Sequence, residues 1–229
     1  MNAAPTTPAT ADKYAQALDG RDPLASMRKG PKRTKKLLKG RSEKELAWRP
    51  APGKWSVKEV LAHHADGEII LGSRLRFVAA MDDAPLPGYD QDLFVTRLGV
   101  EKVKSKALLA AWESARALNV ALLDRLPKGA FARTGLHAER GPESIERMVA
   151  MYAGHDCLHE AQIERTLAEY DAARRARKLE RKAAKVAKKS SQGAAQSAPK
   201  GADKRRKDAS EPKALKKADK QLEAILAAR

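Results

Sequence analysis

The sequence predicts an all-α protein with four main helices and a disordered basic C-terminal tail. Apolar residues recur at helical spacing in four long stretches between residues 22 and 170. No stretch alternates with a period of two for long enough to predict a strand. Residues 82–101, which separate the second helical stretch from the third, hold two prolines and two glycines. Such a segment is typical of a long crossover between helices and not of a tight turn.

The N-terminus carries no signal of secretion. Residues 1–21 are rich in Ala, Thr and Pro at their start and are expected to form a flexible segment, with a short helix over residues 12–18. The basic start and the apolar run of a signal peptide are missing, and no stretch approaches the roughly 18 apolar residues of a membrane span. The single cysteine, Cys157, excludes an intramolecular disulfide. These features favour a cytoplasmic location.

The first bundle helix is predicted from a cap and a proline. Asp22 is a favourable N-cap, and Pro23 suits the first helical position because its missing N–H has no partner there in any case. The helix should run towards Leu38. Pro31 lies inside this stretch and lacks a backbone donor, so we expect either a kink there or a helix that begins near this residue.

Two capping boxes mark further helix starts. In this motif the side chains of the N-cap and of the residue three positions later each bond the other's backbone N–H. Ser42 with Glu45 predicts one short helical turn. Ser56 with Glu59 predicts the start of the second bundle helix, which continues to about Met81.

The third and fourth bundle helices follow the crossover. The third is predicted over residues 102–125 and the fourth over residues 143–170, with Pro142 at its start. The expected inner side of the third helix carries Val103, Leu108, Leu109, Trp112, Leu118, Leu122 and Leu123. The four-helix domain therefore spans residues 22–170.

Residues 171–229 are expected to form a basic low-complexity tail. They hold 19 Lys and Arg against 7 Asp and Glu, a net charge of +12 out of +17 for the whole chain. Residues 173–189 could extend the last helix, since Ala, Lys, Arg, Leu and Glu all favour helix. A basic run without aromatic rings suits non-specific attraction to the phosphates of nucleic acid. A solubilising extension would have the same composition, so both interpretations stay open.

Three histidines form a candidate metal site. His155 and His159 are four residues apart on the fourth helix, so both imidazoles can point to one place. Two ligands are too few for a tight site, and His63, on the apolar side of the second helix, is the candidate third. An isolated pair of this spacing more often reflects packing, and the proposal requires the two helices to face each other.

The neighbouring polar residues have several interpretations. His64 points about 100° away from His63 around the helix and is expected on another face. Asp66 could orient a metal-bound imidazole through a hydrogen bond. His137 is expected in a loop, where it could belong to a lid, contact a substrate or have no role.

Two separated motifs resemble the DinB-like family. The segment PGKWSVKEVLAHHADGE, residues 52–68, is similar to its signature of a Trp-Ser helix start with a histidine eight residues after the tryptophan. The segment GPESIERMVAMYAGHDCLHEAQIERTL, residues 141–167, resembles its last bundle helix with a His-x3-His pair. The resemblance covers residues 22–170 and leaves the tail outside.

The resemblance implies a four-helix bundle of up-down-down-up topology with one divalent metal, zinc or nickel foremost. Its ligands would be His63, His155 and His159, with register favouring His63 over His64. Members of the family include thiol S-transferases that use bacillithiol or mycothiol, a maleylpyruvate isomerase and predicted hydrolases, and bundles of this kind often form homodimers. A low-molecular-weight thiol is therefore an expected partner.

Two functions follow from this interpretation. The first is a metal-dependent enzyme, either a thiol S-transferase or a small hydrolase. The second is a non-catalytic metal-binding bundle that associates with nucleic acid through its basic tail. Arg74, Arg76 and Arg97 could meet an acidic thiol cofactor, although exposed arginines are usually only solvated. A cavity with convergent polar groups beside the metal would favour the enzyme.

Overall fold

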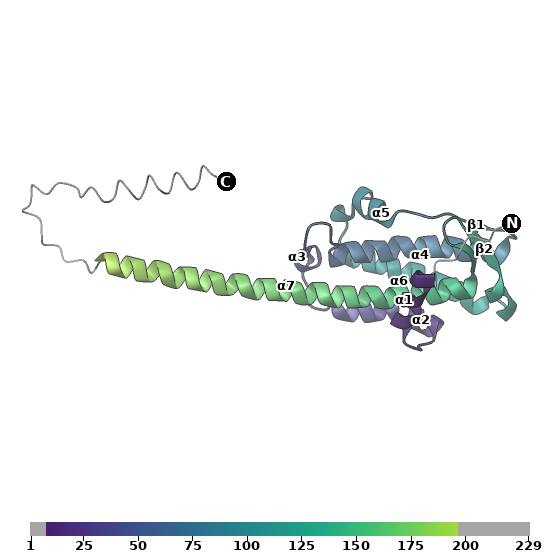
Figure 1. Ribbon diagram of the computed structural model, residues 1–229, viewed down its shortest axis with the longest axis horizontal. Coiled ribbons are helices and arrows are strands. Elements are labelled where there is room, and N and C mark those ends of the chain that lie inside the picture. Colours follow the sequence, from purple (N-terminus) through teal and green to yellow (C-terminus); the bar gives the residue numbers. More distant parts are fainter. Residues whose placement is uncertain (1–7, 197–229) are drawn as a thin grey trace, which may run out of the picture. The chain divides into compact units, whose positions relative to one another are not determined.

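The computed structural model describes the backbone of residues 8–196 and the side chains of residues 13–188. It confirms the predicted helical fold class (Figure 1). Its long helices are α2 (Pro23–Leu37), α4 (Val57–Ala80), α6 (Ser105–Arg125) and α7 (Ile145–Gln196). The shorter elements are α1 (Pro8–Leu18), α3 (Glu43–Leu46), α5 (Gln91–Arg97) and the 3-10 turns η1 (Val100–Lys102) and η2 (Lys128–Ala132).

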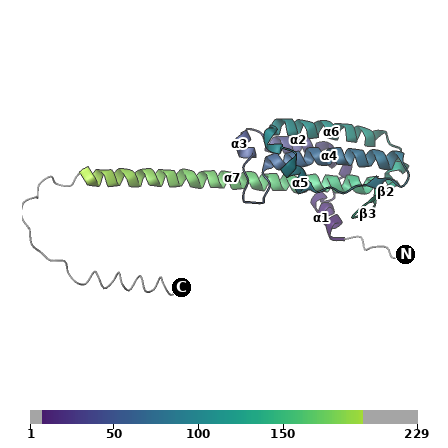
Figure 2. The same ribbon diagram turned by 90° about the horizontal axis from the view of Figure 1, so that it is seen from above.

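The four bundle helices run up, down, down and up, as expected. Lys58, at the start of α4, donates to the carbonyl of Glu101 at 3.1 Å, just before α6 begins. Ser105, the first residue of α6, donates through its backbone N–H to Glu43 at 3.1 Å. Both helices therefore start at the same end of the bundle and are parallel. The crossover that returns the chain to this end contains α5 and η1 (Figure 2).

The predicted helix starts are confirmed by their caps. The Asp22 carboxylate accepts a hydrogen bond from Ala25 N at the start of α2. The capping boxes of Ser42 and Ser56 are both fully formed. The starts of α6 and α7 lie two to three residues later than predicted, because η1 and a strand occupy the intervening positions.

A small sheet contradicts the expectation of no strands. β1 (Pro85–Leu86) pairs in parallel with β2 (Thr134–His137), and β2 pairs in antiparallel fashion with β3 (Gly141–Ser144). Strands of two to four residues that include proline and glycine are too short to show alternation. Gly135 allows the close contact with the end of α4, since a Cβ there would lie 2.8 Å from both the Ala84 carbonyl and the Val78 side chain.

The inner face of α6 is more polar than the sequence predicts. Leu118, expected inside, is 64% exposed, whereas Arg116 and Asn119 are buried. Positions 112, 116, 119 and 123 are three or four residues apart and so share one helix face. Arg116 occupies this face because Glu68 and Asp156 pair with it at 2.7 and 2.6 Å.

The same arginine explains how α2 accommodates an internal proline. Pro31 has no N–H to donate to the carbonyl of Met27, four residues earlier. The Arg116 guanidinium donates to that carbonyl at 2.8 Å. Gly30 leaves room for this contact, because a Cβ there would lie 2.5 Å from Asp156 Oδ2. The helix α2 accordingly starts at Pro23 and continues through Pro31.

Part of the N-terminal segment predicted as flexible packs on the bundle. The helix α1 covers Pro8–Leu18, a longer range than expected. Leu18 is 6% exposed and belongs to the main core. Gly154 of α7 allows the contact, because a Cβ there would lie only 2.2 Å from the carbonyl oxygen of Tyr14.

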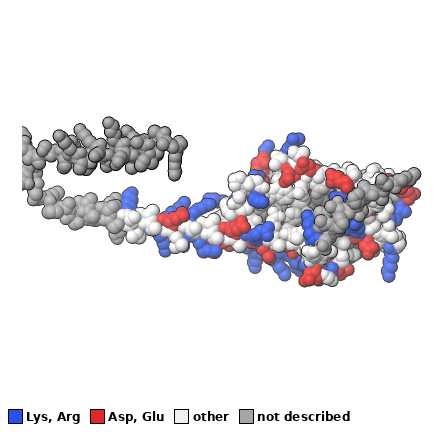
Figure 3. Space-filling view, in the orientation of Figure 1, with Lys and Arg blue, Asp and Glu red and all other residues white. Residues whose placement is uncertain are grey.

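The last helix continues past the predicted end at Tyr170. Strong helix formers carry α7 to Gln196, so the first part of the predicted tail is helical. Lys and Arg side chains follow this part of the helix (Figure 3). The chain divides into two compact units after Lys178. The rest of the predicted tail, residues 197–229, lies outside the described residues. Among the described helices, none combines the length and apolarity needed to cross a membrane.

Ending the chain at Lys178 is expected to shift the melting temperature by less than about 2 °C. Ion pairs join Asp171 to Arg41 and Arg174 to Glu45, and this cut retains both. A cut after Tyr170 removes both and should melt at a lower temperature. Thermal unfolding followed by circular dichroism compares the two chains, and equal losses for both would contradict a boundary near Lys178.

Candidate metal centre

Four of the five histidines gather between α4 and α7. The Nε2 atom of His155 lies 2.9 Å from that of His63 and 3.0 Å from that of His159. His155 and His159 face the same way because they are one helical turn apart. His64, next to His63 on α4, also lies close, with its ring centroid 5.1 Å from that of His159.

The three converging Nε2 atoms fit the requirements of a metal ion. A neutral imidazole carries a single N–H. His155 therefore cannot form hydrogen bonds with the Nε2 atoms of both His63 and His159 and also use its own Nδ1. That Nδ1 is buried without a partner among the described residues. A tetrahedral zinc with Zn–N bonds of 2.0–2.1 Å separates its ligand nitrogens by about 3.3 Å, close to the observed distances. His63, His155 and His159 could therefore hold one divalent ion.

Burial keeps these imidazoles neutral, the form that binds metals. Burial, helped by the charge of His159, lowers the pKa of His63 to about 3. Burial also lowers the pKa of His155 well below 6.5 and lowers that of His159. A metal therefore has few protons to displace from this site at neutral pH.

A second layer of contacts orients the cluster. His159 Nδ1 lies 2.7 Å from Gln162 Oε1, and this bond leaves Nε2 free to accept a metal. Trp55 stacks on His159 with ring centroids 6.4 Å apart and packs against His63. Asp66, expected to orient a ligand, makes no hydrogen bond to these rings within the described chain. Gln162, which lies in the second motif (residues 141–167), orients His159 instead.

His64 faces a different environment from His63, as its position predicts. It is 3% exposed and stacks on Trp112 with ring centroids 4.0 Å apart. Its Nδ1 lies 3.6 Å from Asp156, and together with His155 these residues form a second group of donors that could hold a metal. His155 belongs to both sets and lines the cavity described next; His63 lines it as well, whereas His64 and Asp156 do not.

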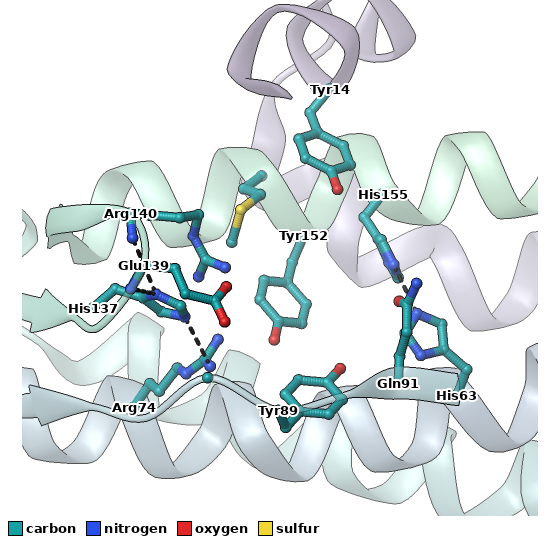
Figure 4. Close-up of a pocket in the computed structure, with 12 residues that line it drawn as sticks. Tyr14, His63, Arg74, Tyr89, Gln91, His137, Glu139, Arg140, Tyr152 and His155 are labelled. Carbon is teal, nitrogen blue, oxygen red and sulfur yellow. Dashed lines mark hydrogen bonds between the residues drawn. The ribbon is translucent and has the colours of Figure 1, made fainter. Parts of the chain in front are cut away.

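A cavity of about 140 Å³ opens beside the histidines (Figure 4). His63 and His155 line one end, and Arg74 and His137 line the other. Tyr14, Tyr89, Tyr152 and Arg140 also line it, and the exposed side chains of Gln91 and Glu139 give it access to solvent. Polar groups from α1, α4, α7 and the small sheet therefore converge on one accessible space.

The sequence does not show which polar residues line the far end of the cavity. His137, expected in a loop, is 1% exposed and lies in β2. Arg74 is 3% exposed and borders the cavity, whereas Arg97 is exposed on α5 and Arg76 bonds the carbonyl of Gly72. The short strands that place His137 have no sequence signal. The helical pattern does not show that Arg74 is buried whereas Arg76 is exposed.

Acidification from pH 6.5 to 5 is expected to destabilise the metal-free protein. In this range the unfolded histidines bind protons, whereas the buried ones, with lowered pKa values, do not. The free energy of unfolding therefore falls as the pH falls, by up to about 1.4 kcal/mol per pH unit for each such histidine. Urea unfolding with a chelator at several pH values measures the slope. The His63→Phe variant should show a shallower slope, and an unchanged one would contradict the buried neutral state.

Comparisons with known proteins agree with the fold. The sequence matches the DinB superfamily over residues 26–163. A similar solved structure is YfiT from Bacillus subtilis, described as a probable metal-dependent hydrolase with an unusual four-helix bundle topology. It shares 19% identity at a TM-score of 0.57, over 72% of this chain and 90% of YfiT.

A second similar structure is the mycothiol-dependent maleylpyruvate isomerase, at 14% identity and a TM-score of 0.51. The match covers 62% of this chain and 59% of the isomerase, so this chain spans little more than half of that enzyme. No curated protein sequence matches this chain. The family match covers more than half of the chain, and the two motifs that carry the histidines lie almost wholly within it. This chain therefore belongs to the DinB superfamily.

Proposed function

We propose that this protein is a metal-dependent enzyme whose single divalent ion is held by His63, His155 and His159. The observation that supports this most directly is the accessible cavity that borders two of these imidazoles. A metal enclosed by apolar side chains would instead favour the alternative, a non-catalytic bundle that associates with nucleic acid through its basic tail. Open coordination positions beside a polar cavity are typical of catalytic metal sites.

The residues of the chain have separate tasks in this proposal. A divalent metal bound by three neutral imidazoles supplies a Lewis acid that lowers the pKa of a water or a thiol. Gln162 fixes the ring of His159 through its Nδ1. Trp55 covers the cluster on one side. Tyr152, which is 8% exposed, narrows the space where a substrate would meet the metal.

The reaction is either thiol S-transfer or hydrolysis of a small molecule. The two similar structures are described as a probable metal-dependent hydrolase and a mycothiol-dependent isomerase. A low-molecular-weight thiol suits the site because zinc and nickel bind both imidazole and thiolate. Zinc or nickel is accordingly the proposed metal.

Metal analysis followed by an activity screen tests this function. Native purified protein is expected to contain about one divalent metal per chain by elemental analysis. It should then accelerate either the conjugation of small thiols to an electrophile or the hydrolysis of activated esters and amides. A chelator-treated sample, reloaded with zinc or nickel, is the matched control. Metal-loaded protein that catalyses neither reaction would contradict the proposed enzyme.

A further inference from the structure

Arg74 is a buried cation whose hydrogen-bonding capacity is only partly used. It lies on α4, is 3% exposed and borders the cavity. One guanidinium nitrogen, Nη2, donates to the carbonyl of Pro87 at 2.5 Å and lies 3.2 Å from His137 Nε2. Its Nε is buried without a partner among the described residues. A guanidinium has five N–H donors and no acceptor. A hydrogen-bond acceptor on a ligand could therefore bond the donors that remain at this end of the cavity.

The carboxylates near Arg74 form no ion pair with it in the described part of the chain, although the charge of Arg74 helps to lower the pKa of Glu143. Glu143 is fully buried and pairs with Arg140 through two hydrogen bonds, at 2.5 and 2.9 Å. Glu139 is exposed and lines the cavity. His137 carries no compensating charge. Within the described chain, Arg74 therefore has no ion-pair partner, and a buried unpaired charge is costly unless a ligand supplies the opposite charge.

Two tyrosines continue the polar wall from Arg74 towards the histidines. Tyr89 and Tyr152 lie between the two ends of the cavity (Figure 4). Burial raises the pKa of both hydroxyls, so each keeps its proton. Neither hydroxyl has a hydrogen-bond partner among the described residues. Each can donate to an anionic oxygen that lies in the cavity.

We infer that the cavity binds an organic carboxylate whose acid group pairs with Arg74 while its reactive end faces the histidine cluster. The second half of this inference rests on the proposed function. Three neutral ligands would leave the charge of a divalent ion uncompensated, which also favours an anionic substrate. Arg74 is the residue that would select it, because a guanidinium forms paired hydrogen bonds with a carboxylate.

The spacing along α4 limits the length of the ligand. His63 and Arg74 are eleven positions apart on this helix, a rise of about 16 Å. The two side chains cover part of that distance, and the remainder suits a chain of several carbon atoms between the carboxylate and the metal-binding group. A thiol separated from a carboxylate by five methylene groups, as in 6-mercaptohexanoate, is a suitable probe.

Calorimetric titration of zinc-loaded protein tests the inference. We expect 6-mercaptohexanoate to bind about 10- to 100-fold more tightly than 6-mercaptohexanol, since a charge-assisted hydrogen bond contributes on this scale. The Arg74→Gln variant should lose this preference while it still binds 6-mercaptohexanol. Arg97→Gln, an exposed arginine outside the cavity, should keep it. Equal binding of the two probes by the native protein, or a preference that survives in Arg74→Gln, would overturn the inference.

Further arms separate this inference from the metal proposal. Arg74→Lys keeps the charge but not the planar guanidinium, so an intermediate preference for 6-mercaptohexanoate is expected. This variant takes the place of Arg74→Gln if Arg74→Gln does not fold. If the native protein binds no zinc, the proposed function fails, and Arg74 is tested with hexanoate on metal-free protein by NMR. Hexanoate shifts that disappear in Arg74→Gln and persist in Arg97→Gln would support the carboxylate site; shifts independent of Arg74 would refute it.

One arm identifies the source of the carboxylate. If hexanoate and 1-propanethiol bind to the zinc-loaded protein together, the acid group belongs to a second substrate. If the joined molecule binds far more tightly than either part and hexanoate alone is weak, the acid group belongs to the thiol itself. Both results place a carboxylate at Arg74.

Discussion

The His155→Ala variant is expected to be isolated without a bound divalent metal. Its Nε2 is the central atom of the cluster, at 2.9 and 3.0 Å from the Nε2 atoms of His63 and His159. Loss of an outer hydrogen-bond partner typically lowers metal affinity 10- to 100-fold, and loss of a direct ligand should cost more. Elemental analysis of the folded variant beside the native protein measures the effect. A full metal complement in His155→Ala would refute the proposed site.

Matched variants show which imidazoles take part. His63→Phe and His64→Phe each keep a ring of similar size, and only the first is expected to lose the metal. His64 stacks on Trp112, and a phenyl ring preserves this contact. The reverse result would assign the metal to the donor group of His64, His155 and Asp156. Gln162→Leu should retain metal with about 10- to 100-fold lower affinity.

Replacing Arg116 by leucine is expected to destabilise the protein by about 3–5 kcal/mol, because it leaves buried carboxylates without a counter-charge. Glu68 and Asp156 are at most 1% exposed, and both lose an ion pair with the guanidinium. The carbonyl of Met27 also loses its donor, since Pro31 cannot replace it. This loss is large against a typical total stability of roughly 5–15 kcal/mol.

Urea unfolding at neutral pH measures the Arg116→Leu effect. Arg125→Leu is the matched control, because Arg125 lies on the same helix, is exposed and, among the described residues, bonds only the carbonyl of Ala121. It should change the free energy of unfolding by less than about 0.5 kcal/mol. Arg116→Lys keeps the charge but cannot reach all three partners, so its loss should be intermediate. A leucine variant as stable as the control would show that the buried pairs contribute no net stability.

Local sequence signals predicted the helices because their causes are local. Ser56 and Glu59 cap α4 through neighbouring backbone groups, and Asp22 does the same for α2. The same holds for the pair His155 and His159, whose spacing alone places both rings on one helix face. The resemblance to the DinB-like family supplied what spacing could not, the expectation that α4 faces α7.

The hydrophobic pattern of the sequence predicts less well which side chains are buried. Leu118 is apolar and was expected inside, yet it is exposed, while the charged Arg116 is buried. A hydrophobic pattern assigns a buried face by composition, but a charged residue enters a core when distant partners neutralise it. Those partners, Glu68 and Asp156, are 48 and 40 positions away in sequence.

The sequence by itself determined the four main helices, the caps of α2, α3 and α4, and the pairing of His155 with His159 on one helix face, because each depends on residues within one or two helical turns. Only the tertiary structure decided that three imidazoles converge, that Arg74 and His137 border the same cavity, and that Arg116 bonds the carbonyl left free by Pro31. These contacts join segments far apart in the chain, and their energies depend on burial and on partners that no local pattern specifies.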